Sequence, residues 1–136
     1  MQNKPMLTRA DVVLALDAAL AEAEKNGWKV TVAVVDDGGH PLGLIRGDGA
    51  APVSALIALE KARSAALGQR ETAGYEQMIN DGRTAFLSAP LQGLLEGGVP
   101  VMVGGQCAGA VGISGVKPEQ DAQVAKAGVA AVTAAL

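Results

Sequence analysis

The sequence contains very few aromatic residues and a single cysteine. Aromatic residues make up 2% of its 136 residues, so an apolar core must be built from Ala, Val, Leu and Ile. A lone Cys107 excludes an internal disulfide and a cysteine-rich metal site, and a small buried hydrophobic side chain is the better interpretation of this thiol. With 49% hydrophobic and 18% charged residues the chain is not disordered, and residues 1–136 have the length of one domain.

Charge of one sign and long apolar runs are also scarce. The net charge is −3 and the eleven Lys and Arg residues form no basic stripe, which argues against nucleic acid as a partner. No run of about 18 apolar residues occurs, so we expect no membrane span. No basic segment precedes an apolar run in the way of a signal peptide, and we therefore expect a cytoplasmic protein.

Hydrophobic periodicity predicts the order helix, hairpin, helix, strand, hairpin, helix. The predicted helices cover residues 8–26, 53–69 and 118–136, with a helical turn at 75–80, and the predicted strands cover residues 30–35, 40–46, 91–95, 101–103 and 108–113. Thr8 and Asp11 resemble a capping box at the first helix, and Asp36-Asp37-Gly38-Gly39 is a strong hairpin signal. This pattern indicates an α+β fold with an antiparallel sheet of about five strands and helices on its faces.

The single histidine, His40, directly follows the first hairpin turn and should lie at one end of the sheet. An imidazole there suits a ligand to haem iron or a general acid/base at neutral pH, whereas a turn histidine bonded to the backbone is the structural alternative. One histidine excludes multi-histidine zinc sites and still permits a single axial haem ligand. A carboxylate at Asp36 would orient the imidazole, or would serve only the turn.

Two cations and a glycine-rich segment complete the candidate site residues. Arg46 and Lys61 are candidates to bind a ligand carboxylate, although a solvated helix face would also explain such cations. Lys61 lies among apolar residues, which favours partial burial. Gly112 and Ser114 belong to a segment, residues 109–115, whose bare backbone would suit a flat ligand or a tightly packed subunit.

Five blocks of sequence, in order along the chain, resemble the GlcG/HbpS-like family, which includes the C-terminal domain of PduO-type adenosyltransferases. The blocks are Val32-Ala-Val-Val-Asp-Asp-Gly-Gly-His40, Arg46-Gly-Asp-Gly-Ala50, Lys61-Ala-Arg-Ser-Ala65, Gly97-Gly-Val-Pro-Val101 and Gly109-Ala-Val-Gly-Ile-Ser-Gly115. The resemblance implies a profilin-like or PAS-like α/β/α sandwich around a five-stranded antiparallel sheet. It also implies homo-oligomers, dimer-based and up to octamers, and haem binding in some members, others being named from catabolic operons.

The family pattern makes the Asp-x-Gly-Gly-His turn, which ends at His40, and the region of Lys61 the leading site candidates. The helix predicted over residues 8–26 contains no histidine, so it offers no imidazole to haem. Three functions stay open. In the first, the chain is a small-ligand or haem-binding sensor or carrier with His40 as the metal ligand. Alternatively, it is an enzyme of carboxylate or aromatic metabolism that uses His40 with Asp36, while Arg46 or Lys61 holds an anion. The third function is that of an oligomeric assembly protein without chemistry.

Overall fold

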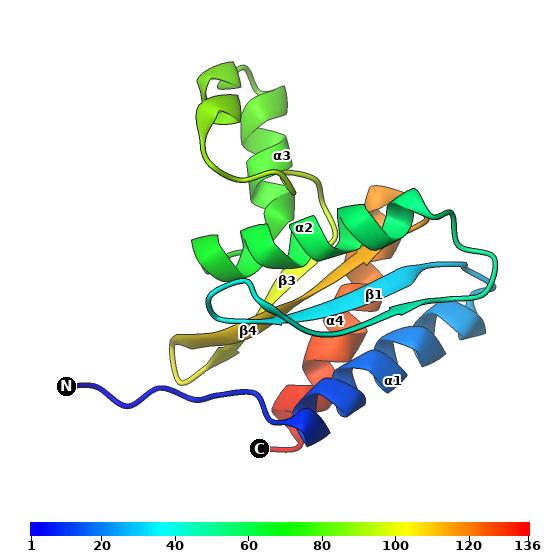
Figure 1. Cartoon of the computed structure of the whole chain (residues 1–136). Helices are drawn as coiled ribbons and strands as arrows, with labels where there is room; N and C mark the ends of the chain where they lie inside the picture. The colour runs from blue at the N-terminus through cyan, green and yellow to red at the C-terminus, as the bar shows by residue number, and fades with distance from the viewer.

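A computed structural model describes all of residues 1–136 and shows a four-stranded antiparallel sheet between two layers of helices (Figure 1). The helices are α1 (Arg9–Lys25), α2 (Val53–Gly68), α3 (Thr72–Asn80), the 3-10 helix η1 (Thr84–Ser88) and α4 (Pro118–Ala134). The strands are β1 (Thr31–Asp36), β2 (Pro41–Arg46), β3 (Gly98–Val103) and β4 (Gln106–Ser114), in the spatial order β2-β1-β4-β3. The predicted α+β class is therefore confirmed.

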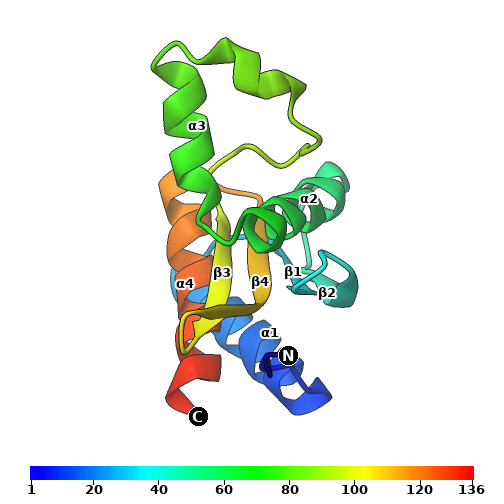
Figure 2. The same cartoon turned by 90° about the vertical axis from the view of Figure 1, so that its left-hand side faces the viewer.

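Helix α2 covers one face of the sheet, and α1 and α4 cover the other (Figure 2). Alternate residues of β1 supply the two cores: Val32 and Val34 pack with α1 and α4, while Ala33 and Val35 pack with α2. A strand that buries both alternating sets must be apolar throughout, which is the pattern that the sequence shows over residues 30–35. Helix α1 begins at the predicted capping box, where the Thr8 N–H donates to Asp11 Oδ2 at 2.8 Å.

Helix α2 lies unusually close to the sheet because glycines face it. A Cβ atom added to Gly112 of β4 would stand 2.1 Å from the carbonyl oxygen of Ala58, and one added to Gly98 of β3 would stand 2.3 Å from the carbonyl oxygen of Lys61. The side chains that α2 packs against the sheet are alanines: Ala58, Ala62, Ala65 and Ala66. Small residues on both sides allow the backbones of helix and strand to come together.

The predicted fifth strand, residues 91–95, is wrong. These residues form bends and coil between η1 and β3 and pair with no strand. Their backbone is bound to α2 instead, because the N–H of Gly93 donates to Ser64 Oγ at 3.1 Å. Leu94 is buried. The leucines of this segment line a cleft with residues of α3 and η1, and a short apolar run alone does not distinguish such a segment from a strand.

Residues 70–90 form an arm that projects from the body of the molecule (Figures 1 and 2). The helical turn predicted over residues 75–80 is there, within the longer α3, and η1 follows it. The rings of Tyr75 and Phe86 stack with centroids 5.1 Å apart, and the guanidinium of Arg70 lies 4.4 Å from the centre of the Tyr75 ring. Aromatic stacking and a cation–π contact therefore hold the arm together.

Candidate functional site

The sheet separates the candidate residues into two groups. Arg46 of β2 and Ser114 of β4 both pair with Thr31 at the start of β1, so they lie at one end of the sheet. His40 and Asp36 lie at the hairpin turn, at the other end. Strand β2 has six residues between the two ends, and at about 3.3 Å per residue this puts Arg46 roughly 20 Å from His40 within one chain.

The first hairpin turn is built around the Asp36 carboxylate. Its Oδ1 atom accepts the backbone N–H groups of Gly38 and His40, each at 2.9 Å, and Gly39 has a φ of +80°. The carboxylate therefore fixes the backbone of the turn and makes no hydrogen bond or ion pair with the imidazole. The exposed ring of His40 makes no hydrogen bond or ion pair within the chain, so both of its nitrogens are free to meet a ligand.

A second set of contacts ties this turn to α2. Arg63 Nε donates to the carbonyl oxygen of Gly39 at 3.2 Å, and its Nη1 donates to Glu60 Oε1 at 2.6 Å. Nothing in the sequence near Arg63 indicates this contact, because its partner lies 24 residues away. The turn that carries His40 is thus held both from within, by Asp36, and from the neighbouring helix.

Beside the start of β2 lies an apolar groove with a volume of about 310 Å³. It is lined by Leu42, two residues after His40, and by residues of α1 and the segment before it, among them Leu7, Val12, Leu16 and Arg9. Residues 7–16 and 42–43 are distant in sequence, so no local motif could predict this groove. It offers an aliphatic surface with a guanidinium at its edge.

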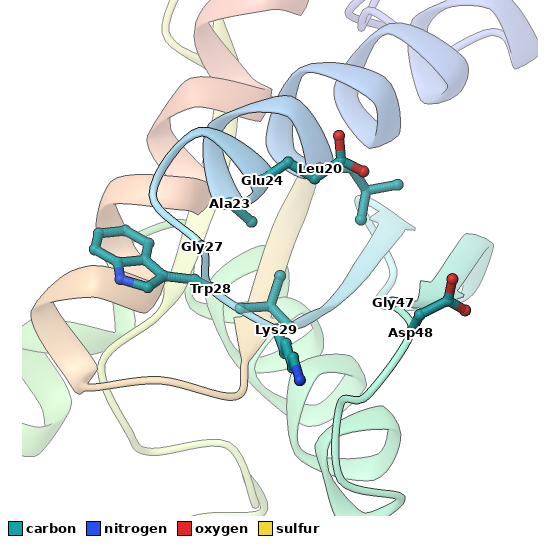
Figure 3. A pocket seen from close by; sticks show the side chains of 9 residues that line it. Leu20, Ala23, Glu24, Gly27, Trp28, Lys29, Gly47 and Asp48 are labelled. Carbon is teal, nitrogen blue, oxygen red and sulfur yellow. The ribbon is translucent and has the colours of Figure 1, made fainter.

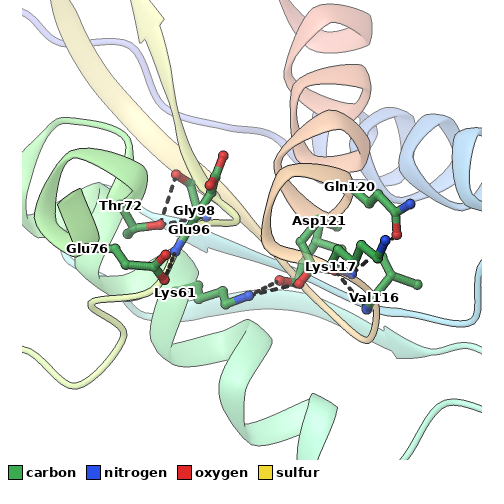
Figure 4. Close-up of polar contacts among 10 residues, drawn as sticks. Lys61, Thr72, Glu76, Glu96, Gly98, Val116, Lys117, Gln120 and Asp121 are labelled. Atoms are coloured by element: carbon green, nitrogen blue, oxygen red, sulfur yellow. Dashed lines mark hydrogen bonds and ion pairs between the residues drawn. The ribbon is translucent and has the colours of Figure 1, made fainter. Parts of the chain in front are cut away.

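Lys61 forms a buried ion pair with Asp121 (Figure 4). Its Nζ lies 3.0 Å from Asp121 Oδ2 and 3.0 Å from the carbonyl oxygen of Ile113, while Asp121 Oδ1 accepts the N–H of Val116 at 3.2 Å. Both side chains are at most 5% exposed. Burial raises the pKa of Asp121, and the ammonium of Lys61 partly opposes this shift.

This ion pair joins α2 to the start of α4, and no cavity is lined by Lys61. The partial burial expected from its apolar neighbours is confirmed. Gly112 faces α2, Ser114 is buried in the sheet, and Arg46 is exposed. Ligand contacts by these residues, and catalysis by Lys61, stay predictions.

The structure contains no group of three or more His, Cys, Asp or Glu residues placed to hold a metal ion. None of its helices combines the length and the apolar character that crossing a membrane requires. The fold and the single histidine define a class: a small three-layer α+β domain with one exposed imidazole at a hairpin turn.

The comparison with known proteins supplies the family. The family described as "Haem degrading protein HbpS-like" matches residues 7–130, and the chain belongs to this HbpS-like family. The resemblance found in the sequence is thereby confirmed.

Three known proteins illustrate the relationship. Protein GlcG of Escherichia coli is 56% identical over 114 residues, which cover 84% of this chain and 85% of that protein. The crystal structure of a double mutant of HbpS from Streptomyces reticuli has a TM-score of 0.86 and 34% identity, over 96% of this chain and 89% of that one. The structure of a PduOC:haem complex has a TM-score of 0.83 and 26% identity, over 93% and 95% of the two chains.

Proposed function

We propose that this protein binds haem or a related flat, anionic ligand, and that the His40 imidazole would supply the nitrogen that holds the iron. The observation that carries this proposal is an unpaired imidazole on a fixed backbone, two residues before Leu42, which lines an apolar groove. Haem iron in proteins is commonly held by one histidine. The structure of a related chain as a haem complex, and the haem-degrading description of the family, support the same ligand class.

The residues around the groove fit such a group. Leu7, Val12, Leu16 and Leu42 offer an aliphatic surface to one side of a porphyrin ring, and the guanidinium of Arg9 suits a propionate carboxylate. At about 310 Å³ the groove is open and covers only part of a large ligand. Bound haem would supply redox and oxygen chemistry. The chain itself would supply the nitrogen ligand, the apolar surface and the cation.

Titration with ferric haem, followed by absorption spectroscopy, tests the proposal. Wild-type protein is expected to give a saturable shift of the Soret band, and His40→Ala to lose the spectrum of a histidine-ligated iron with a roughly tenfold or greater loss of affinity. Added free imidazole should restore that spectrum in His40→Gly. Asp37→Asn is the matched control, because it alters the same turn and keeps the imidazole. An unchanged spectrum and affinity in His40→Ala would refute the assignment.

We also infer that a second copy of this chain pairs with β2. This strand is a sheet edge, and three of its large apolar side chains, Leu42, Leu44 and Ile45, are 40–43% exposed. An unprotected apolar edge of this kind invites strand pairing. In an antiparallel, two-fold pairing of β2 with β2, the Arg46 end of one copy meets the His40 end of the other.

Such a homo-oligomer would unite the two residues that a single chain keeps apart, and Arg46 would then add a cation near the proposed ligand. Native mass spectrometry checks this directly. Leu44→Lys in the edge strand should shift the protein towards monomer, whereas Leu87→Lys on the exposed part of η1 should not. A monomeric wild-type protein at micromolar concentration would contradict the inference.

The cytoplasmic location expected from the sequence stays a prediction, which cell fractionation would test.

A further inference from the structure

A second cleft, with a volume of about 320 Å³, lies at the end of the sheet opposite to His40 (Figure 3). The last turns of α1, the connection to β1 and the turn after β2 form its walls. Figure 3 shows Leu20 and Glu24 at one edge, Asp48 at a second and Lys29 at a third, while the indole of Trp28 turns away from the space. The cleft is independent of the proposed haem site.

Backbone hydrogen bonds fix these walls. Gly27 has a φ of +71°, and the N–H of Trp28 donates to the carbonyl oxygen of Ala23 at 2.9 Å, which ends α1 in a Schellman motif. The N–H of Gly47 donates to the carbonyl oxygen of Val30 at 2.9 Å and joins the turn after β2 to the start of β1. The backbone of the segments that form the cleft is therefore fixed by the fold.

Charged side chains of both signs line this cleft and do not pair with one another. Glu24, Lys29 and Asp48 make no side-chain hydrogen bond and no ion pair within the chain. A Cβ atom at Gly49 would stand 2.7 Å from Cδ and 3.2 Å from Nζ of Lys29, so this glycine leaves the room in which the lysine side chain lies along the turn. One lysine and two acidic residues thus stand, exposed, at separate edges of the cleft, and none of them is paired within the chain.

We propose that this cleft binds a small zwitterion of the amino-acid class with an aliphatic side chain. The ammonium of the ligand would face the carboxylates of Glu24 and Asp48, its carboxylate would face Lys29, and its aliphatic part would rest on Leu20 and Ala23 of α1. A ligand with both charges pairs with all three groups. An amine alone leaves Lys29 unpaired, and a carboxylate alone meets two like charges.

The chain's only tryptophan, Trp28, belongs to the cleft wall with its indole turned away from the space, so its fluorescence would report a shift of this wall, and the heat of binding measures the affinity directly. We would titrate the protein with L-leucine, and with 3-methylbutylamine and 4-methylpentanoate as analogues that each lack one charged group, following Trp28 fluorescence and, in parallel, the heat of binding. L-Leucine should bind about tenfold more tightly than either analogue, because each analogue loses a charged contact. Equal affinities, or no saturation with L-leucine up to about 10 mM by either method, would overturn the proposal.

Single substitutions test which residue binds each charged group of the ligand. Lys29→Gln should lower the affinity for L-leucine about tenfold and leave that for the amine unchanged or higher, and Asp48→Asn should weaken the amine and L-leucine together. Asp17→Asn and Lys25→Gln, which lie on α1 and outside the cleft, remove the same charges and are the controls, and both should bind as the wild type does. If Lys29→Gln binds L-leucine as tightly as the wild type, the assignment of the carboxylate partner is wrong.

Discussion

Replacing Gly112 with alanine tests how closely α2 and β4 are packed. The added Cβ atom would stand 2.1 Å from the carbonyl oxygen of Ala58, 2.5 Å from the amide nitrogen of Ala62 and 2.8 Å from the Cβ of Ala62. All three atoms belong to the helix, two of them to its backbone, so no side chain can rotate out of the way. Ordinary contact begins at 3.4 Å, and α2 must therefore retreat by more than about 1 Å.

The expected loss of unfolding free energy follows from the contacts of α2 that such a retreat weakens. A radial gap of about 0.5–1 Å forfeits a quarter to a half of the dispersion energy of each contact, and the four alanines that α2 packs against the sheet would all be affected. Overpacking alone usually costs about 1–3 kcal/mol, and the ion pair between Lys61 and Asp121, which joins α2 to α4, would be stretched as well. We expect the free energy of unfolding to fall by about 3–5 kcal/mol.

Urea denaturation followed by far-ultraviolet circular dichroism, at fixed protein concentration, measures this change. Gly104→Ala is the matched control: the same substitution is made at a turn with a φ of +57° and nothing within 4 Å of the added Cβ, so only backbone strain of about 1–2 kcal/mol is expected. A Gly112→Ala protein that unfolds within about 0.5 kcal/mol of the control would refute the reasoning, because the close approach would then carry no energetic weight.

Two further predictions concern charged groups. Lys61→Met should cost about 3–5 kcal/mol of unfolding free energy, because it leaves the Asp121 carboxylate buried without its partner, and the double variant Lys61→Met/Asp121→Leu should recover part of that loss in the same urea assay. A loss below about 1 kcal/mol in the single variant would show that the ion pair contributes little to the free energy of unfolding. The Thr8 backbone N–H lowers the pKa of Asp11 below its ordinary value of 3.8, so its contribution to stability is present above pH 3.8 and is lost as the pH falls through the lowered pKa. In thermal melts between pH 2 and 6, Asp11→Asn should therefore show a shallower acid decline than the wild type; equal slopes would contradict this assignment.

The parts of the fold that local chemistry dictates were predictable from the sequence. A capping box marks the start of α1, β-branched residues mark β1, and Asp36 with two glycines marks the first turn. Each signal lies within a few residues of the structure that it specifies. Residues 91–95 show where such signals fail. A hydrogen bond from Gly93 to Ser64 holds this segment to α2, and its leucines line a cleft with residues of α3 and η1, so no local periodicity marks it.

The candidate sites depend more strongly on long-range packing. The sequence correctly placed His40 at a sheet end, because a turn motif precedes it. It gave no sign that Arg63 supports this turn from α2, or that Lys61 has a buried partner sixty residues further on, since both contacts arise only when helices cross the sheet. The two clefts likewise combine segments that no motif connects.

The positions of the aromatic rings have an experimental consequence. Tyr75 and Phe86 both belong to the projecting arm, whereas Trp28 packs against the main core at the end of α1. The tyrosine signal therefore reports on the arm, and the tryptophan signal reports on the body of the molecule. If the arm melts before the body, the near-ultraviolet dichroism of tyrosine will fade while the indole emission remains native, and partial opening becomes visible without any label.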